Sequence, residues 1–166
     1  MGKVFLIRHA ECEGNVEGRL SGMTDFSLTQ NGIKQAYRLA NALKEKAVIQ
    51  CVYSSPPKRA VDTANIVACV YNLDSFEIDD ELREINYGSY DGMTWAEINT
   101  RNPTVWVNWK EIFHYPVGIP KQEKCIDVQK RMVKAMKRIA EESFKKIYVL
   151  SLMGLQYRVS YAILND

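Results

Sequence analysis

The chain of 166 residues is 46% hydrophobic and 25% charged, and its 22 basic and 20 acidic side chains leave a formal net charge of +2. This composition suits one domain with a sizeable core, so residues 1–166 are predicted to form a single domain. The balanced charge argues against nucleic-acid binding, and no segment resembles a signal peptide or a membrane span. Four scattered cysteines lack metal-ligand spacing, so we expect a cytoplasmic protein with no membrane contact.

The first half of the chain predicts two strand-loop-helix units. An apolar run at residues 3–7 gives way to a polar stretch with glycines, which indicates a buried strand that feeds a long loop. Apolar residues at helical spacing predict a helix over 29–46 with Thr29 as its N-cap. A second apolar run, 48–53, stops at Ser54-Ser55-Pro56-Pro57 and precedes another helix.

The second half predicts a strand near 76–82, a helix near 122–143, a strand at 147–151 and a short final helix. The apolar stripe of the helix near 122–143 is predicted to consist of Ile126, Val133, Met136, Ile139 and Ala140. The aromatic segment between Trp95 and Pro120 has no clear periodicity, and we assign it no element.

Strands that alternate with helices predict an α/β fold, a three-layer αβα sandwich around a mostly parallel sheet with right-handed crossovers. Sheets of this kind bind their ligands at the carboxyl ends of strands. We therefore expect the polar loops that follow the predicted strands to converge.

Two basic side chains and a histidine stand where a phosphate could bind. Arg8 and His9 follow the first strand, and neighbouring arginines keep a histidine neutral and nucleophilic, while a carbonyl or carboxylate bonded to its other ring nitrogen fixes the tautomer. Arg59 lies in the first turn of a helix, where its planar fork and the backbone N–H groups suit phosphate oxygens. The alternatives are a simple strand end for the first pair and a solvated surface charge for Arg59.

Glu84 follows the third predicted strand, where a carboxyl group could protonate a leaving alkoxide and later take a proton from water. The alternative is that Glu84 belongs to a solvated acidic face with Asp79, Asp80 and Glu81.

Together, Arg-His after the first strand, Ser-Ser-Pro-x-x-Arg-Ala after the second and Leu-x-Glu-x-x-Tyr-Gly after the third resemble the histidine phosphatase superfamily, the phosphoglycerate-mutase-like enzymes. The resemblance includes residues 28–32 and 35–36, and it runs from Lys3 to about Arg158. It implies that His9 becomes phosphohistidine and that Glu84 is the acid and base. It also implies a substrate phosphate site made of Arg8, Asn15 and Arg59.

The second histidine motif of this family is altered. Family members carry a Ser-His-Gly type motif after the last central strand, and here that stretch reads Ser151-Leu152-Met153-Gly154. Leu152 therefore stands at the degenerate second-histidine position, and removing one such donor costs about 10²–10³ in rate. His114, the other histidine, is expected to be structural or on the surface.

The sequence thus predicts a phosphatase that hydrolyses small-molecule phosphate monoesters through phosphohistidine and is impaired because the second histidine is absent. One open alternative is a catalytically inactive descendant, a pseudoenzyme that binds phosphate ligands. The other is a phosphoglycerate mutase-type phosphotransferase, against which stands Ile85, since mutase-like members often carry a basic residue there. No cofactor and no metal are predicted, because arginines supply the positive charge. The oligomeric state stays open, with a homodimer as one alternative.

Overall fold

Within residues 3–104, 119–142 and 147–152, which the computed structural model describes, four strands form a parallel sheet with the order β1-β4-β2-β3. The strands are β1 (Lys3–Arg8), β2 (Cys51–Ser54), β3 (Glu77–Ile78) and β4 (Ile147–Leu152). Because β4 lies between β1 and β2, the carboxyl ends of these three strands meet at one edge of the sheet.

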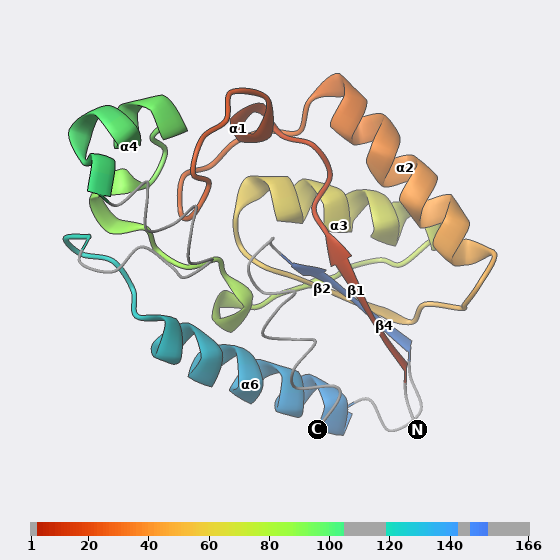
Figure 1. Cartoon of the computed structure of the whole chain (residues 1–166). Coiled ribbons are helices and arrows are strands. Elements are labelled where there is room, and N and C mark those ends of the chain that lie inside the picture. The colour runs from red at the N-terminus through yellow and green to blue at the C-terminus, as the bar shows by residue number, and fades with distance from the viewer. Residues whose placement is uncertain (1–2, 105–118, 143–146, 153–166) are drawn as a thin grey trace.

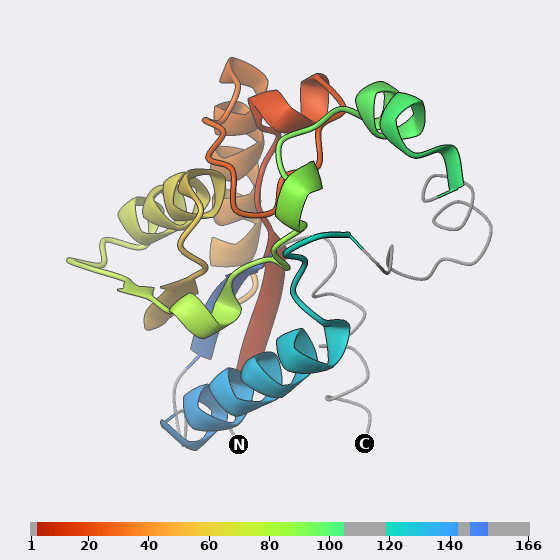
Figure 2. The same ribbon diagram turned by 90° about the vertical axis from the view of Figure 1, so that its left-hand side faces the viewer.

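Helices cover both faces of this sheet. The described helices are α1 (Glu13–Val16), α2 (Gln30–Lys44), α3 (Lys58–Val70), α4 (Trp95–Arg101) and α6 (Cys125–Glu142), with short 3-10 turns η1 (Asp80–Leu82) and η2 (Gly88–Tyr90). α2 and α3 lie on one side of the strands and α6 lies on the other, as Figures 1 and 2 show. The predicted three-layer α/β architecture is confirmed.

The alternation of side chains along β1 explains why two helical layers are needed. Val4 and Leu6 pack against the apolar cluster beneath α6, whereas Phe5 and Ile7 join the cluster beneath α2 and α3. Successive side chains of a strand point to opposite faces, so an uninterrupted apolar run requires cover on both. Local sequence pattern and layer architecture therefore agree.

The start of α2 follows the prediction. The hydroxyl of Thr29 accepts a hydrogen bond from the Gly32 N–H at 2.9 Å, which satisfies one of the open donors of the first turn. Small side chains then let α2 and α3 pack closely. The fully buried alanines of these two helices are Ala36, Ala40, Ala60 and Ala64.

The third predicted strand is mostly wrong. Only Glu77–Ile78 pairs in the sheet, and η1 follows at once. The Asp79 carboxylate accepts a hydrogen bond from the Glu81 N–H at 3.0 Å, which favours a tight turn over a continued strand. The acidic residues that follow Ile78 thus end this edge strand early.

The predicted stripe of α6 is also corrected. Ile126 is 52% exposed and Ala140 lies on the surface, although Met136 and Ile139 are buried as expected. The buried face of α6 consists of Val128, Met132, Ala135, Met136 and Ile139. The predicted final helix, His114 and most of the aromatic segment lie outside the described residues. None of the described helices is long and apolar enough to cross a membrane.

Candidate active site

The structure brings the predicted nucleophile, phosphate-site arginines and acid to one edge of the sheet. His9 follows the last residue of β1, Arg59 lies in the first turn of α3, and Glu84 follows η1. The charges of Arg8 and Arg59 act on the imidazole of His9, and the charge of Glu84 acts on Arg59.

His9 is held as a neutral base. Its side chain is only 7% exposed, and its Nδ1 lies 2.7 Å from the carbonyl oxygen of Ala10. Because a carbonyl can only accept, Nδ1 carries the hydrogen and Nε2 carries the lone pair. Burial lowers the pKa of His9 to about 4, the bond to Ala10 opposes this, and the charges of Arg59 and Arg8 lower the pKa further. At neutral pH the ring is therefore unprotonated at Nε2, as a nucleophile requires.

The loop after His9 is anchored to both helices of its layer. The Ala10 N–H donates to the Thr63 hydroxyl of α3 at 3.1 Å. Glu11 is tied to the start of α2: its carboxylate accepts from Thr29 at 2.6 Å and its N–H donates to the Gln35 side chain at 3.0 Å.

Gly32 is required for this contact. A Cβ at Gly32 would lie 1.9 Å from the Glu11 carbonyl oxygen, so no larger residue fits. Residues of the stretches 28–32 and 35–36, in which the sequence predicted only the N-cap Thr29, thus fix the His9 loop.

Arg59 is an interior side chain, so the alternative of a solvated surface charge is wrong. It is fully buried, and its guanidinium donates to three carbonyl oxygens of the loop at residues 21–24: Thr24 at 2.9 Å, Gly22 at 2.9 Å and Ser21. A guanidinium keeps its charge in such a place, so Arg59 both braces residues 21–24 and places a positive charge beside His9.

The same loop is held from a second side by Asp91, a residue that the sequence analysis missed. Its carboxylate accepts from the Met23 N–H at 2.7 Å and from the Thr24 hydroxyl at 2.8 Å. Nothing in the local pattern around Asp91 indicated this, because its partners lie 67 and 68 residues away in the chain.

Asn15 and Arg8 are both exposed residues. Asn15 is an exposed residue of α1, and its side-chain oxygen accepts from both the N–H (3.1 Å) and the thiol (3.2 Å) of Cys12. Since the oxygen accepts from Cys12, the N–H₂ group is the part of the amide that could donate to a ligand. Arg8 is exposed at the end of β1.

Glu84 is buried, which rules out a solvated acidic face for this residue. Its side chain is 4% exposed, and one carboxylate oxygen accepts from the Ile85 N–H at 2.9 Å. Asp80 and Glu81 nearby instead form ion pairs with Arg83 and Lys134 at the surface. The acid predicted for the site therefore differs from its acidic neighbours in burial.

Leu152 is the last residue of β4 and pairs in register with Arg8 on β1. Ser151 pairs with both Ile7 and Ser54. The backbone at residue 152 thus stands beside the residue that precedes His9.

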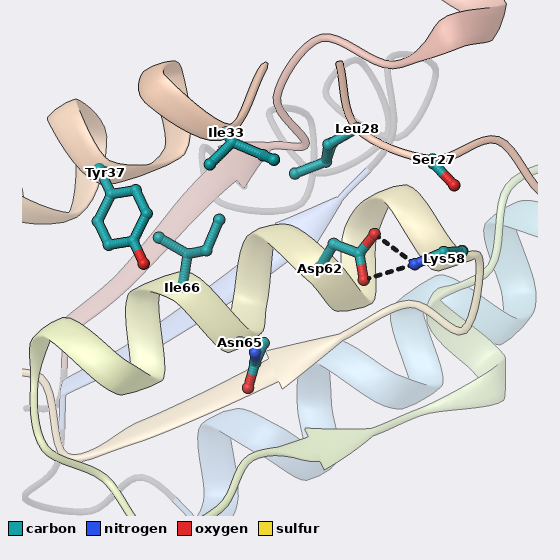
Figure 3. Close-up of a pocket in the computed structure, with 8 residues that line it drawn as sticks. All are labelled: Ser27, Leu28, Ile33, Tyr37, Lys58, Asp62, Asn65 and Ile66. Carbon is teal, nitrogen blue, oxygen red and sulfur yellow. Dashed lines mark hydrogen bonds and ion pairs between the residues drawn. The ribbon is translucent and has the colours of Figure 1, made fainter. Parts of the chain in front are cut away.

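A separate surface pocket of about 390 Å³ lies between α2 and α3 (Figure 3). Its lining combines an apolar side, an Asn65 amide and the ion pair of Lys58 with Asp62 at 2.8 Å. The apolar side consists of Leu28, Ile33, Tyr37 and Ile66. None of the predicted site residues lines it. In the described part of the chain, no group of three or more histidine, cysteine, aspartate or glutamate side chains could hold a metal ion.

A parallel α/β sandwich with these loops at one sheet edge defines the phosphoglycerate-mutase-like class of fold. The model of the histidine phosphatase superfamily (branch 1) matches residues 4–156, and the chain belongs to that family. Phosphoserine phosphatase 1 of Hydrogenobacter thermophilus is 31% identical over 164 residues, which cover 99% of this chain and 76% of the relative.

Two further matches are to a mutase and to a solved structure. The 2,3-bisphosphoglycerate-dependent phosphoglycerate mutase of Parabacteroides distasonis is 40% identical over 100 residues, or 58% of this chain and 40% of the mutase. Among solved structures, Bacillus stearothermophilus YhfR superposes with a TM-score of 0.88 at 28% identity, covering 100% of this chain and 81% of that one.

Proposed function

We propose that this protein is a metal-independent phosphatase that hydrolyses small-molecule phosphate monoesters through a phosphohistidine at His9. The observation that carries the proposal is the state of His9: a buried ring with Nδ1 bonded to Ala10 and a pKa lowered to about 4 by burial, with the charges of Arg59 and Arg8 adding to this. A neutral imidazole with its lone pair on Nε2 is the form that can attack phosphorus.

The reaction has two steps. In the first, Nε2 of His9 forms a bond to phosphorus while the bond from phosphorus to the ester oxygen breaks, and Glu84 gives its proton to the leaving alkoxide. In the second, water attacks the phosphohistidine and gives its proton to Glu84, which releases phosphate and frees Nε2. Arg8 and Asn15 donate to the phosphate oxygens during both steps, and Arg59, whose Nη atoms donate to the carbonyl oxygens of residues 21–24, supplies positive charge beside His9.

We further propose that Leu152 replaces the second active-site histidine and that turnover is slow for this reason. The register of Leu152 beside Arg8 supports this, because a donor at that position would stand next to the phosphate site. A preorganised donor of this kind is worth about 10²–10³ in rate.

Two further statements stay predictions: residues 1–166 form one domain, and the protein is cytoplasmic.

Two other functions remain as outcomes of a test. A binding descendant would keep the phosphate site without turnover, but a carboxyl group buried like Glu84 has no evident use in a pure binder. The match to a phosphoglycerate mutase favours a phosphotransferase, yet it covers only 40% of that enzyme. A phosphatase is also the named activity of the relative that matches nearly the whole chain.

The test is hydrolysis of an aryl phosphate across pH by the wild type and by His9→Ala and His114→Ala. We expect slow turnover by the wild type, none by His9→Ala, and wild-type rates from the control His114→Ala. Rapid quenching should also trap a phosphorylated chain that is stable in alkali and labile in acid, as phosphohistidine is. A wild type that binds inorganic phosphate without turnover is a binding descendant, and equal turnover by His9→Ala would overturn the proposal.

A further inference from the structure

A largely buried arginine–glutamate pair contacts the backbone around Glu84. Arg131 of α6 donates to both oxygens of Glu123, from Nε at 2.8 Å and from Nη2 at 2.9 Å. The two side chains are only 10% and 14% exposed. Such a bidentate pair fixes the plane of the guanidinium, which a single point charge could not do.

The remaining donors of Arg131 bond to the backbone around Glu84. Nη1 donates to the carbonyl oxygens of Glu81 at 2.9 Å and Arg83 at 2.6 Å, and Nη2 donates to that of Glu84 at 3.1 Å. Arg131 lies 47 residues after Glu84 in the chain. One side chain thus satisfies three backbone acceptors of the segment that contains the end of η1 and Glu84.

Glu123 holds the same segment on the far side of Glu84. Its carboxylate accepts from the Asn86 N–H at 3.3 Å, and its own N–H donates to the Asn86 carbonyl oxygen at 2.9 Å. Burial raises the pKa of the Glu123 carboxyl, but the bond and charge of Arg131, with Asn86 and Arg83, lower it below its usual value. Glu123 is therefore ionised at neutral pH, and the pair keeps both charges.

We propose that Arg131, oriented by Glu123, is a positioning residue that sets the Glu84 carboxyl group for proton transfer. The inference rests on the proposed phosphatase activity. Arg131 donates hydrogen bonds to the carbonyl oxygens of the residue before Glu84 and of Glu84 itself. Glu123 accepts a hydrogen bond from Asn86, two residues after Glu84. A displacement of a catalytic group by about 1 Å can cost about 10²-fold in rate. Loss of these hydrogen bonds should therefore displace the Glu84 carboxyl group and weaken it as an acid without removing it.

The experiment compares two esters that differ in their need for an acid. The alkoxide that leaves phosphoserine needs a proton, whereas dinitrophenolate leaves without one. We expect Arg131→Met and Arg131→Lys to lower kcat/KM on phosphoserine about 10²-fold while the value on dinitrophenyl phosphate changes little. Glu84→Gln should show the same preference more strongly. Inhibition by inorganic phosphate should stay unchanged, because the phosphate-site residues lie on other elements.

Arg138→Met is the matched control, since Arg138 lies on the same helix and is 45% exposed but pairs with the side chain of Asp79, five residues before Glu84. It should leave the ratio between the two esters unchanged. Thermal unfolding checks each variant, and Arg131→Lys serves if Arg131→Met does not fold.

The outcomes separate this inference from the activity on which it rests. If the wild type hydrolyses neither ester, the phosphatase proposal fails and takes the positioning role with it. If the wild type and Glu84→Gln behave as expected but both Arg131 variants lose activity equally on the two esters, only the positioning role is overturned. A wild type that cleaves dinitrophenyl phosphate alone also contradicts it, because Glu84 then assists no leaving group.

Discussion

The ends of β1 and β4 lie side by side yet differ in kind. β1 ends in Arg8 and leads to His9, whereas β4 reaches its end in register with Arg8 at an apolar residue, Leu152. The bonds that hold the loop after His9 come from α2 and α3, and those around Glu84 come from Arg131 of α6 and from Glu123, which precedes that helix. The proposed nucleophile and acid are thus placed by helices and loops, so we expect a change at residue 152 to alter the chemistry without dismantling the site.

The largest expected effect comes from replacing the apolar residue at the end of β4 by a polar one, so that both strand ends are polar. If Leu152 occupies the place of a phosphate-contacting histidine, Leu152→His should raise kcat for aryl phosphate hydrolysis about 10²–10³-fold, or about 3–4 kcal/mol of transition-state stabilisation. Steady-state kinetics on the purified variant measures this directly.

Leu152→Ala is the matched variant for that comparison. It removes the apolar side chain without adding a donor, so its rate should remain within a small factor of the wild type. An equal acceleration by alanine would show that bulk, not the missing donor, limits turnover. No acceleration by either variant would remove Leu152 as the cause of any impairment.

A smaller effect belongs to the β1 end alone and concerns stability. The folded pKa of His9 is about 4 because of burial and the nearby arginines, and its ordinary value is 6.5. Between these two values the unfolded chain binds a proton that the folded chain does not, so stability is lost as pH falls from 6.5 to 4. The loss from this residue is about 3 kcal/mol.

Urea unfolding at pH 7, 5.5 and 4 measures this loss. The free energy of unfolding of the wild type should fall more steeply over that range than that of His9→Gln, by about 3 kcal/mol in total. Parallel pH profiles for the two proteins would mean that His9 titrates normally, and the argument for a neutral nucleophile would then rest on the tautomer alone.

Parts of the site that are local in sequence could be predicted, and parts that depend on distant partners could not. Apolar runs located β1 and β2, and cap chemistry located the start of α2 at Thr29. Arg8 and His9 follow directly from a strand end. Residues whose role is to grip distant backbone, such as Arg131 and Asp91, gave no signal, because their partners lie about 50 and 70 residues away.

The two wrong elements share one physical reason. The strand predicted at 76–82 and the stripe predicted for α6 were both inferred from apolar residues without knowledge of what each segment faces. η1 packs against α6, so what each segment buries depends on the other. Leu82 is fully buried there while Ile126 is half exposed, a distinction that hydropathy alone does not contain.

The smallest expected effect concerns the loop after β1, where Cys12 holds the side chain of Asn15. The thiol of Cys12 donates to the Asn15 side chain at 3.2 Å, beside a second bond from the Cys12 N–H. A single neutral hydrogen bond is worth about 0.5–1.5 kcal/mol, so Cys12→Ala should weaken competitive inhibition by inorganic phosphate about 2- to 10-fold. Cys12→Ser keeps a donor and should lose less, while Cys69→Ala, an exposed cysteine of α3, should lose nothing. Equal inhibition of all three variants would show that the backbone N–H alone orients Asn15, since substitution leaves that bond in place.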